Sequence, residues 1–227
     1  MKDKSNLFFS LLSIIFMSLS PNVSGQDTIP EFTSFTKGRL LVALGGSISS
    51  STDNRIDNSS GQYNVLNNYS VNARMAKVLA RNFAFGLSFS TEKFRSSHQL
   101  LEVDQEVLML GPWGAYYFTN GQPGGIFIQG GAYFVNYYEH SEFKAITPII
   151  EEYAQGKGFA GAIGFGYTYV VFDRIGLEVS MVYSQAKIYG EMVNTAPLNI
   201  SSNSEFNRIN VMFQFGFTVL FDKIRDE

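Results

Sequence analysis

The chain has 227 residues, no cysteine and a formal net charge of −3, which excludes disulfide-stapled folds, thiolate metal sites, a cysteine nucleophile and lipid attachment at a cysteine. The negative charge also argues against nucleic acid as a partner, because nucleic acid selects a basic surface. Charged residues make up only 16% of the chain and aromatic residues 15%, whereas a soluble domain usually carries about a quarter charged residues.

The N-terminal segment has the features of a secretory signal peptide. Two lysines precede an apolar run over 7–19, and small residues precede Gln26. The alternative, a membrane anchor helix, needs about 20 apolar residues, which this run does not reach. The sequence therefore predicts a signal peptide over 1–25 with cleavage after Gly25, followed by a polar periplasmic linker over 26–37.

Eight later stretches alternate apolar with polar or small residues. Successive side chains of a β-strand point to opposite faces, so this alternation predicts strands rather than helices. The last stretch has an apolar residue at every odd position from Ile209 to Phe221. That is long for a soluble sheet, where strands average about 5 to 6 residues, and it suffices for a bilayer, which about 9 to 11 tilted residues cross. The predicted strands are 38–49, 69–80, 83–94, 105–118, 126–139, 156–171, 175–189 and 205–221.

The connections between these strands alternate in length. Short turns are predicted at 81–82, 119–125 and 172–174, and long loops at 50–68, 95–104, 140–155 and 190–204. Short turns at one end and long loops at the other are typical of a membrane barrel, which must close because hydrocarbon leaves no partner for an unpaired strand edge. We expect an all-β fold: an eight-stranded antiparallel up-and-down transmembrane β-barrel over 38–221, with a periplasmic tail over 222–227.

The weaker stripe of each strand carries most of the ionisable groups. With the apolar stripe facing lipid, the predicted lumen residues are Arg39, Arg74, Glu92, Glu106, Gln129, Glu178, Arg208 and Gln214. Charges in an enclosed space need partners, and distance from the short turns pairs Arg39 with Glu178, Arg74 with Glu92, and Arg208 with Glu106. Alternation alone does not fix which stripe faces inward, so a soluble barrel with an apolar interior remains an open alternative at this point.

Aromatic residues gather near the ends of the predicted strands. Trp and Tyr favour membrane interfaces, where the ring contacts lipid and the polar group contacts headgroups. The predicted lipid-facing girdle comprises Tyr69, Phe83, Trp113, Tyr117, Tyr137, Tyr169, Tyr183, Tyr189 and Phe221.

With these features, residues 38–221 resemble the small eight-stranded outer-membrane barrels of the OmpA and OmpX type. The resemblance rests on the signal peptide, the alternating connections, the PWGAYYF segment at 112–118 and the aromatic last strand ending at Phe221. It implies the outer membrane of a diderm bacterium, contact with outer-membrane lipids and lipopolysaccharide, assembly by the barrel assembly machinery through the last strand, and an extracellular partner at the loops. Such family members usually end at the terminal strand, whereas DKIRDE follows Phe221 here.

Several short motifs suggest chemistry but lack its context. GKGFAG at 156–161 matches the dinucleotide fingerprint G-x-G-x-x-G, yet a strand follows it, where the fingerprint requires a helix. EHSE at 139–142 places a histidine and a serine next to each other, so that they point apart on a strand, and His98 has no serine at the matching spacing. DNRID at 53–57 lacks the glycine and final glutamate of a calcium loop. No catalytic residue, cofactor or metal site is predicted.

The expected role is therefore that of a non-enzymatic surface barrel with a filled lumen, which acts in envelope integrity, adhesion or ligand contact. Eight strands give an interior just wide enough for side chains to fill. A narrow solute or ion channel and a lipid-A-modifying enzyme are the two alternatives. The loop segment KAITPIIEEY contains Ile146, Ile149 and Ile150, an apolar cluster that either covers the barrel mouth or binds a partner.

Overall fold

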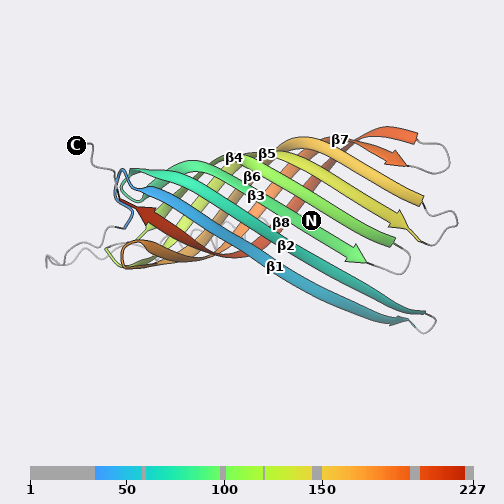
Figure 1. Cartoon of the computed structure of the whole chain (residues 1–227), viewed down its shortest axis with the longest axis horizontal. Coiled ribbons are helices and arrows are strands. Elements are labelled where there is room, and N and C mark those ends of the chain that lie inside the picture. The colour runs from blue at the N-terminus through green and yellow to red at the C-terminus, as the bar shows by residue number, and fades with distance from the viewer. Residues whose placement is uncertain are drawn as a thin grey trace, which may run out of the picture. The chain divides into compact units, whose positions relative to one another are not determined.

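The computed structural model describes residues 34–57, 60–97, 101–119, 121–144, 150–194 and 200–222. Eight antiparallel strands follow one another around a closed barrel, each beside its neighbour in the chain (Figure 1). No helix long and apolar enough to span a membrane occurs in the part of the chain that the structure describes. The strands are β1 (Leu40–Asp57), β2 (Ser60–Ala80), β3 (Phe83–Ser97), β4 (Leu101–Phe118), β5 (Gly124–Phe143), β6 (Ile150–Val171), β7 (Ile175–Asn194) and β8 (Ile200–Phe221). The predicted fold class is confirmed.

The predicted long loops are wrong, because most of their residues belong to strands. We call the end of the barrel with these predicted loops the hairpin end. The strands there are separated only by 58–59, 98–100, 144–149 and 195–199. A strand pair that extends into water still satisfies its backbone hydrogen bonds with its neighbour, and it needs no apolar stripe to do so. Such polar strand extensions therefore resemble loops in the sequence.

Tight connections close the opposite end, which we call the short-turn end. Asn82 in the first turn has a φ of 63°, and Phe172 and Asp173 in the third have φ values of 51° and 56°. The amide of Arg174 donates to the carbonyl of Val171 over 3.1 Å, which closes a β-turn with Phe172 and Asp173 at its centre. Positive φ at both central residues of a turn gives the backbone a twist that matches the twist of the flanking strands. All three short turns lie where the sequence predicts them.

The apolar stripe faces outward. On β8, Phe213 and Phe215 are 68% and 67% exposed, whereas the adjacent Met212 is buried. Arg74, Glu92 and Glu178 are buried inside the barrel. A soluble barrel with an apolar interior and a polar exterior would have the reverse arrangement, so that alternative is excluded.

One junction of the barrel is much shorter than the others. β1 and β8 share seven residue pairs, from Leu40 with Phe221 to Gly46 with Phe215, whereas the other neighbouring strands share between 15 and 20 pairs. Beyond Gly46, β1 leaves β8 but stays paired with β2, and β2 stays paired with β3 as far as Val65, so only the tip of the β1–β2 hairpin extends past the other strands (Figure 1). The sheet is therefore closed at the short-turn end and unpaired along one junction at the hairpin end.

Candidate functional site

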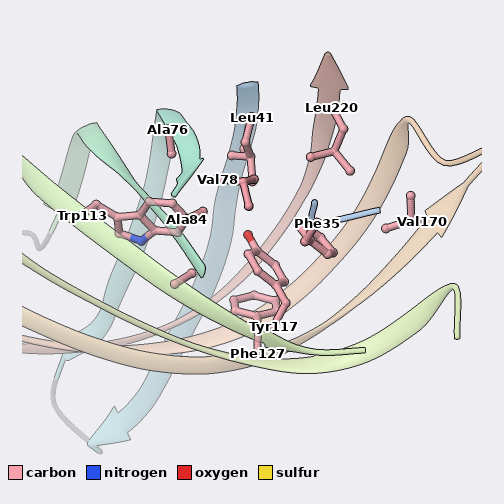
Figure 2. Close-up of a cluster of buried hydrophobic side chains, with 12 residues drawn as sticks. Phe35, Leu41, Ala76, Val78, Ala84, Trp113, Tyr117, Phe127, Val170 and Leu220 are labelled. Atoms are coloured by element: carbon pink, nitrogen blue, oxygen red, sulfur yellow. The ribbon is translucent and has the colours of Figure 1, made fainter. Parts of the chain in front are cut away.

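The candidate functional site is the lumen, and its short-turn end is filled by apolar side chains. Phe35 lies inside the barrel and stacks on Tyr117 with ring centroids 3.8 Å apart and planes 9° apart. The Tyr117 ring in turn contacts Phe127 at 5.4 Å, and Figure 2 shows the three rings together. We call the buried set the basal plug: Phe35, Leu41, Val78, Tyr117, Phe127, Val170 and Leu220.

The basal plug includes part of the predicted linker. The amide of Asn82 donates to the Phe35 carbonyl over 3.0 Å, and the amide of Gly38 donates to the Val78 carbonyl over 2.8 Å. Arg39 Nη1 donates to the Ser34 carbonyl over 2.8 Å. Residues 34–39 are therefore bonded to the barrel and reach into its lumen, while residues 1–33, with the predicted signal peptide, lie outside the described residues.

Arg39 does not pair with Glu178, contrary to the prediction. Its guanidinium lies 3.2 Å from the Asp173 carboxylate and 3.0 Å from Asp222, and Arg174 lies 2.9 Å from the same Asp222. Asp173 lies in a turn and Asp222 follows β8, and the alternation of strand residues cannot predict the direction of side chains outside the strands. Arg39 thus links the start of β1 to the last short turn and to the end of β8.

Arg74 forms the central ion pair of the lumen. Its Nη2 lies 2.5 Å from Glu178 Oε2, and both side chains are buried. Arg74 Nη1 also donates to Gln129 over 3.1 Å, and Thr218 donates to the other Glu178 oxygen over 2.6 Å. The prediction that Arg74 pairs with Glu92 is wrong. The strands of a barrel are tilted and staggered, so two residues that are equally far along the chain from their short turns lie at different heights in the lumen.

A second polar cluster lies nearer the hairpin end. Arg208 Nη2 lies 2.9 Å from Glu92 Oε2, and Asn210 Nδ2 donates to the same oxygen over 2.9 Å. We call these three residues the latch, because they join β3 to β8 across the lumen, past β1 and β2. The predicted partner of Arg208, Glu106, is wrong: it is exposed on the outer face of β4, whose odd-numbered residues Val107 and Met109 are buried.

Three predicted girdle residues face the lumen instead of lipid. Trp113, Tyr117 and Tyr137 are 2%, 0% and 5% exposed. Both stripes of β4 are apolar, so alternation does not identify its lipid face there, and a narrow barrel fills its interior with bulky rings. Trp113 lies beneath Arg74, with 5.0 Å from the guanidinium carbon to the ring centre, and donates to Gln129 over 3.0 Å. The remaining predicted girdle residues are exposed on the outer face: Tyr69, Phe83, Tyr169, Tyr183, Tyr189 and Phe221.

The upper lumen contains a network around Glu139. Tyr137 and Gln105 both donate to Glu139 Oε2, the latter over 2.7 Å, and Ser141 donates to Oε1 over 3.2 Å. His140 stacks on Tyr153 with ring centroids 4.6 Å apart. His140 falls in the predicted loop 140–155, which is wrong at this position, because β5 extends to Phe143; the other histidine, at 98, lies outside the described residues.

An ion-pair belt lies on the outer face near the hairpin end. Glu102 accepts from Arg95 over 2.5 Å and from Lys144 over 2.7 Å, and Lys93 lies 3.6 Å from Asp104. Glu102 is the second residue of β4, beyond the 9 to 11 residues next to the short turns that cross a bilayer. The hydrogen bonds from Lys144 and then Arg95 lower the pKa of Glu102 to about 2, because both stabilise the carboxylate.

The other sequence motifs lie within strands. GKGFAG at 156–161 lies within β6, and an added Cβ at Gly158 would lie 1.9 Å from the Lys187 carbonyl oxygen, so this glycine permits close strand contact. DNRID at 53–57 belongs to β1. Within the described ranges no group of three histidine or acidic residues could hold a metal ion. Ile146 and Ile149 lie outside the described residues.

Sequence reasoning missed several lumen residues. Asn210 and Gln105 have the inward parity of their strands, so a complete list of polar residues on that stripe would have included them. Phe35, Asp173 and Asp222 lie outside the strands and gave no such signal. Of the eight predicted lumen residues, Gln129 bonds to Arg74 and Gln214 lines a cavity beside it.

No family model and no curated protein matches the chain by sequence. Among solved structures, a major outer membrane protein from Thermus thermophilus matches with a TM-score of 0.52 and 10% identity, over 81% of this chain and 98% of that one. The outer membrane protease OmpT from Escherichia coli matches with a TM-score of 0.50 and 12% identity, over 81% and 79%. Neisserial surface protein A matches with a TM-score of 0.47 and 14% identity, over 82% and 98%. At these identities the likeness concerns the fold alone: the chain has the fold of the small eight-stranded outer-membrane β-barrels.

Proposed function

We propose that this chain is a non-enzymatic outer-membrane protein of a diderm bacterium, with a lumen sealed against solutes. The basal plug is the observation that carries this proposal, because Phe35, Tyr117 and Phe127 are each no more than 1% exposed inside the short-turn end. The Arg74–Glu178 pair lies above the plug, and the two charges neutralise each other, so neither attracts an ion. Its role is then carried by the outer surface at the hairpin end, in envelope integrity or in contact with an extracellular partner.

The exposed apolar band and the predicted signal peptide support this location. We propose cleavage after Gly25, export to the periplasm, and insertion by the barrel assembly machinery through β8, which ends in Phe221. The short turns and both chain ends then lie in the periplasm, and the ion-pair belt lies at the lipopolysaccharide headgroups. Outer-membrane lipids and lipopolysaccharide are the first partners that this arrangement supports.

The geometry at His140 favours a role without catalysis. Adjacent strand residues point apart, and Ser141 is buried against Glu139 while His140 stacks on Tyr153. A histidine base that activates a serine must lie within hydrogen-bond reach of it, and the ring of His140 is directed to Tyr153 instead. A deletion strain is therefore expected to keep the mass of its lipid A, and a changed acyl number would favour the enzymatic alternative.

Conductance in planar bilayers tests the seal directly. The wild-type protein is expected to give no stepwise current, and the variant Phe35→Ala is expected to give brief openings, because it removes the ring that fills the short-turn mouth. The conservative variant Phe35→Leu serves as the control and should remain silent. Regular single-channel steps from the wild-type protein would favour the narrow channel instead. Envelope fractionation with heat-modifiable gel mobility checks the location.

A further inference from the structure

The unpaired part of the β1–β8 junction lies partly at bilayer depth. We call it the open seam: Ser47–Asp57 on β1 and Ile200–Gln214 on β8, which share no residue pairs. On β8 the outward residues Ile209, Val211 and Phe213 lie beyond the last pair and are 61%, 55% and 68% exposed. Unpaired strand edges are costly in hydrocarbon. The base of the open seam therefore needs something that covers it from the lipid side or from the lumen.

A cavity of about 50 Å³ lies in the lumen beside the base of the open seam. Polar and apolar side chains both line it, among them Asn72, Arg74, Ser88, Met109, Met212 and Gln214. One water needs at least about 10 to 15 Å³ of such volume, so the cavity holds only a few heavy atoms. It fits a head group and is too small for a whole drug-sized molecule.

Asn72 lies where the cavity meets the open seam, and its amide has no partner. The side chain is 5% exposed, and neither Nδ2 nor Oδ1 has a hydrogen-bond partner among the described residues; the same holds for Arg74 Nε. Asn72 is opposite Gly45, in the last pairs before the seam opens. A Cβ at Gly45 would lie 3.1 Å from Asn72 Oδ1 and 3.0 Å from the Phe215 carbonyl oxygen, so the glycine leaves room for the amide between β2 and β8.

Buried polar groups in proteins almost always have a partner, so unpaired donors that line a cavity indicate a ligand or water. The unpaired donors here are Asn72 Nδ2 and Arg74 Nε, and they suit a group that accepts hydrogen bonds. Next to them, Met109 and Met212 provide a flexible apolar wall. Ser47 Oγ donates to Met212 Sδ over 3.9 Å, and this contact bridges the base of the open seam.

We propose that the cavity and the open seam form a lateral binding site for a single-chain carboxylic acid that enters from the bilayer. The carboxyl group accepts hydrogen bonds from Asn72 and Arg74 Nε, and the alkyl chain displaces the contact between Ser47 and Met212 and lies against the outer face of β8. The basal plug prevents passage to the short-turn end, so the site binds without conducting. This proposal requires a membrane location and is independent of the role at the cell surface.

The test uses the full-length protein in phosphatidylcholine vesicles with spin-labelled stearic acid, whose mobility is followed by electron paramagnetic resonance. Because the chain has no cysteine, Ser47→Cys with Met212→Cys introduces one pair that can close the open seam by a disulfide. The reduced variant is expected to immobilise the label saturably, as the wild type does, and the oxidised form to bind at least fivefold more weakly.

The head-group contact is tested by Asn72→Leu, which should weaken binding about tenfold, the loss expected for a hydrogen-bonding partner. Asn136→Leu, on the outer face of β5, is the matched control and should bind as the wild type does. Unlabelled palmitic acid should compete, and hexadecane should not. Equal immobilisation in oxidised and reduced protein, an unchanged Asn72→Leu, or no saturable signal would overturn the proposal and leave water in the cavity. None of these results depends on conductance, so the seal is judged separately.

Discussion

The two ends of the barrel are closed by different means. At the short-turn end all strand junctions are paired, and Phe35, Tyr117 and the Arg74–Glu178 pair fill the lumen. At the hairpin end β1 leaves β8, and the latch joins β3 to β8 across the lumen. The difference shows that backbone pairing and side-chain packing act together at one end, while side-chain hydrogen bonds replace the missing pairing at the other. The two ends should therefore respond differently to mutation.

The largest loss of stability is expected from Arg74→Ala. It leaves the Glu178 carboxylate buried without its cation, which typically costs about 3 to 5 kcal/mol. The free energy of unfolding, from urea titration in lipid vesicles, measures the effect. Lys77→Ala removes an exposed cation of the same strand and should change stability by less than about 0.5 kcal/mol. The double variant Arg74→Ala with Glu178→Ala should recover part of the loss; no recovery would contradict the pairing.

The next largest loss of stability is expected from Phe35→Ala, about 3 kcal/mol. This value is at the lower end of the range for a buried phenylalanine, because residues 34–39 lie at the edge of the barrel. Its stacked contact with Tyr117 is removed, and residues 34–39 should become accessible to protease. Limited proteolysis followed by mass spectrometry measures this release. If the N-terminal segment stayed as protected as in the wild type, Phe35 would not hold it in place.

At the hairpin end, Arg208→Ala should cost less, about 1 to 3 kcal/mol, the range for a buried acceptor that loses a donor. Asn210 still donates to Glu92, and Arg208 is partly exposed, so water can replace some of the contact. Amide hydrogen exchange should accelerate in the upper parts of β1 and β8 and stay unchanged in the basal plug. Lys187→Ala breaks an exposed pair with Glu205 and an exposed contact with the Tyr189 ring, and it is the control. Uniform acceleration along the barrel would show that the two ends are not independent.

A gain of about 1 kcal/mol is expected from Phe172→Asn with Asp173→Gly. Both positions have positive φ, which costs a bulky L-residue roughly 1 to 2 kcal/mol and glycine almost nothing. The midpoint of urea unfolding should rise. Phe172→Ala keeps the unfavourable φ and should bring no such gain, so an equal gain from it would assign the effect to the exposed ring.

The smallest effect is expected from Glu102→Gln in the outer ion-pair belt. The pKa of Glu102 is lowered to about 2, so its contribution to stability is present above its unfolded pKa, near 4.5, and is lost as the pH falls toward 2. Exposed pairs contribute at most about 1 kcal/mol. Unfolding between pH 6 and pH 2 should therefore show a slightly weaker acid dependence in the variant, and 1 M salt should remove the difference.

The sequence by itself determined the number and order of the strands, the positions of the short turns and the lipid-facing stripe of β8. These features depend on local alternation, which the pleat of a strand imposes on every second residue. It did not determine the lipid face of β4, since Trp113 and Tyr117 lie on one apolar stripe and Tyr116 and Phe118 on the other. Nor did it distinguish the polar strand extensions from loops.

Only the tertiary structure decided which charges meet. Arg74 and Glu178 are 104 positions apart in the chain, and their contact depends on the tilt of every strand between them. The entry of Phe35 into the lumen and the early end of the β1–β8 junction are likewise set by closure of the whole barrel. Alternation depends only on neighbouring residues. The height of a side chain in the lumen depends on the tilt and register of all the strands between it and its partner, so no local sequence pattern predicts it.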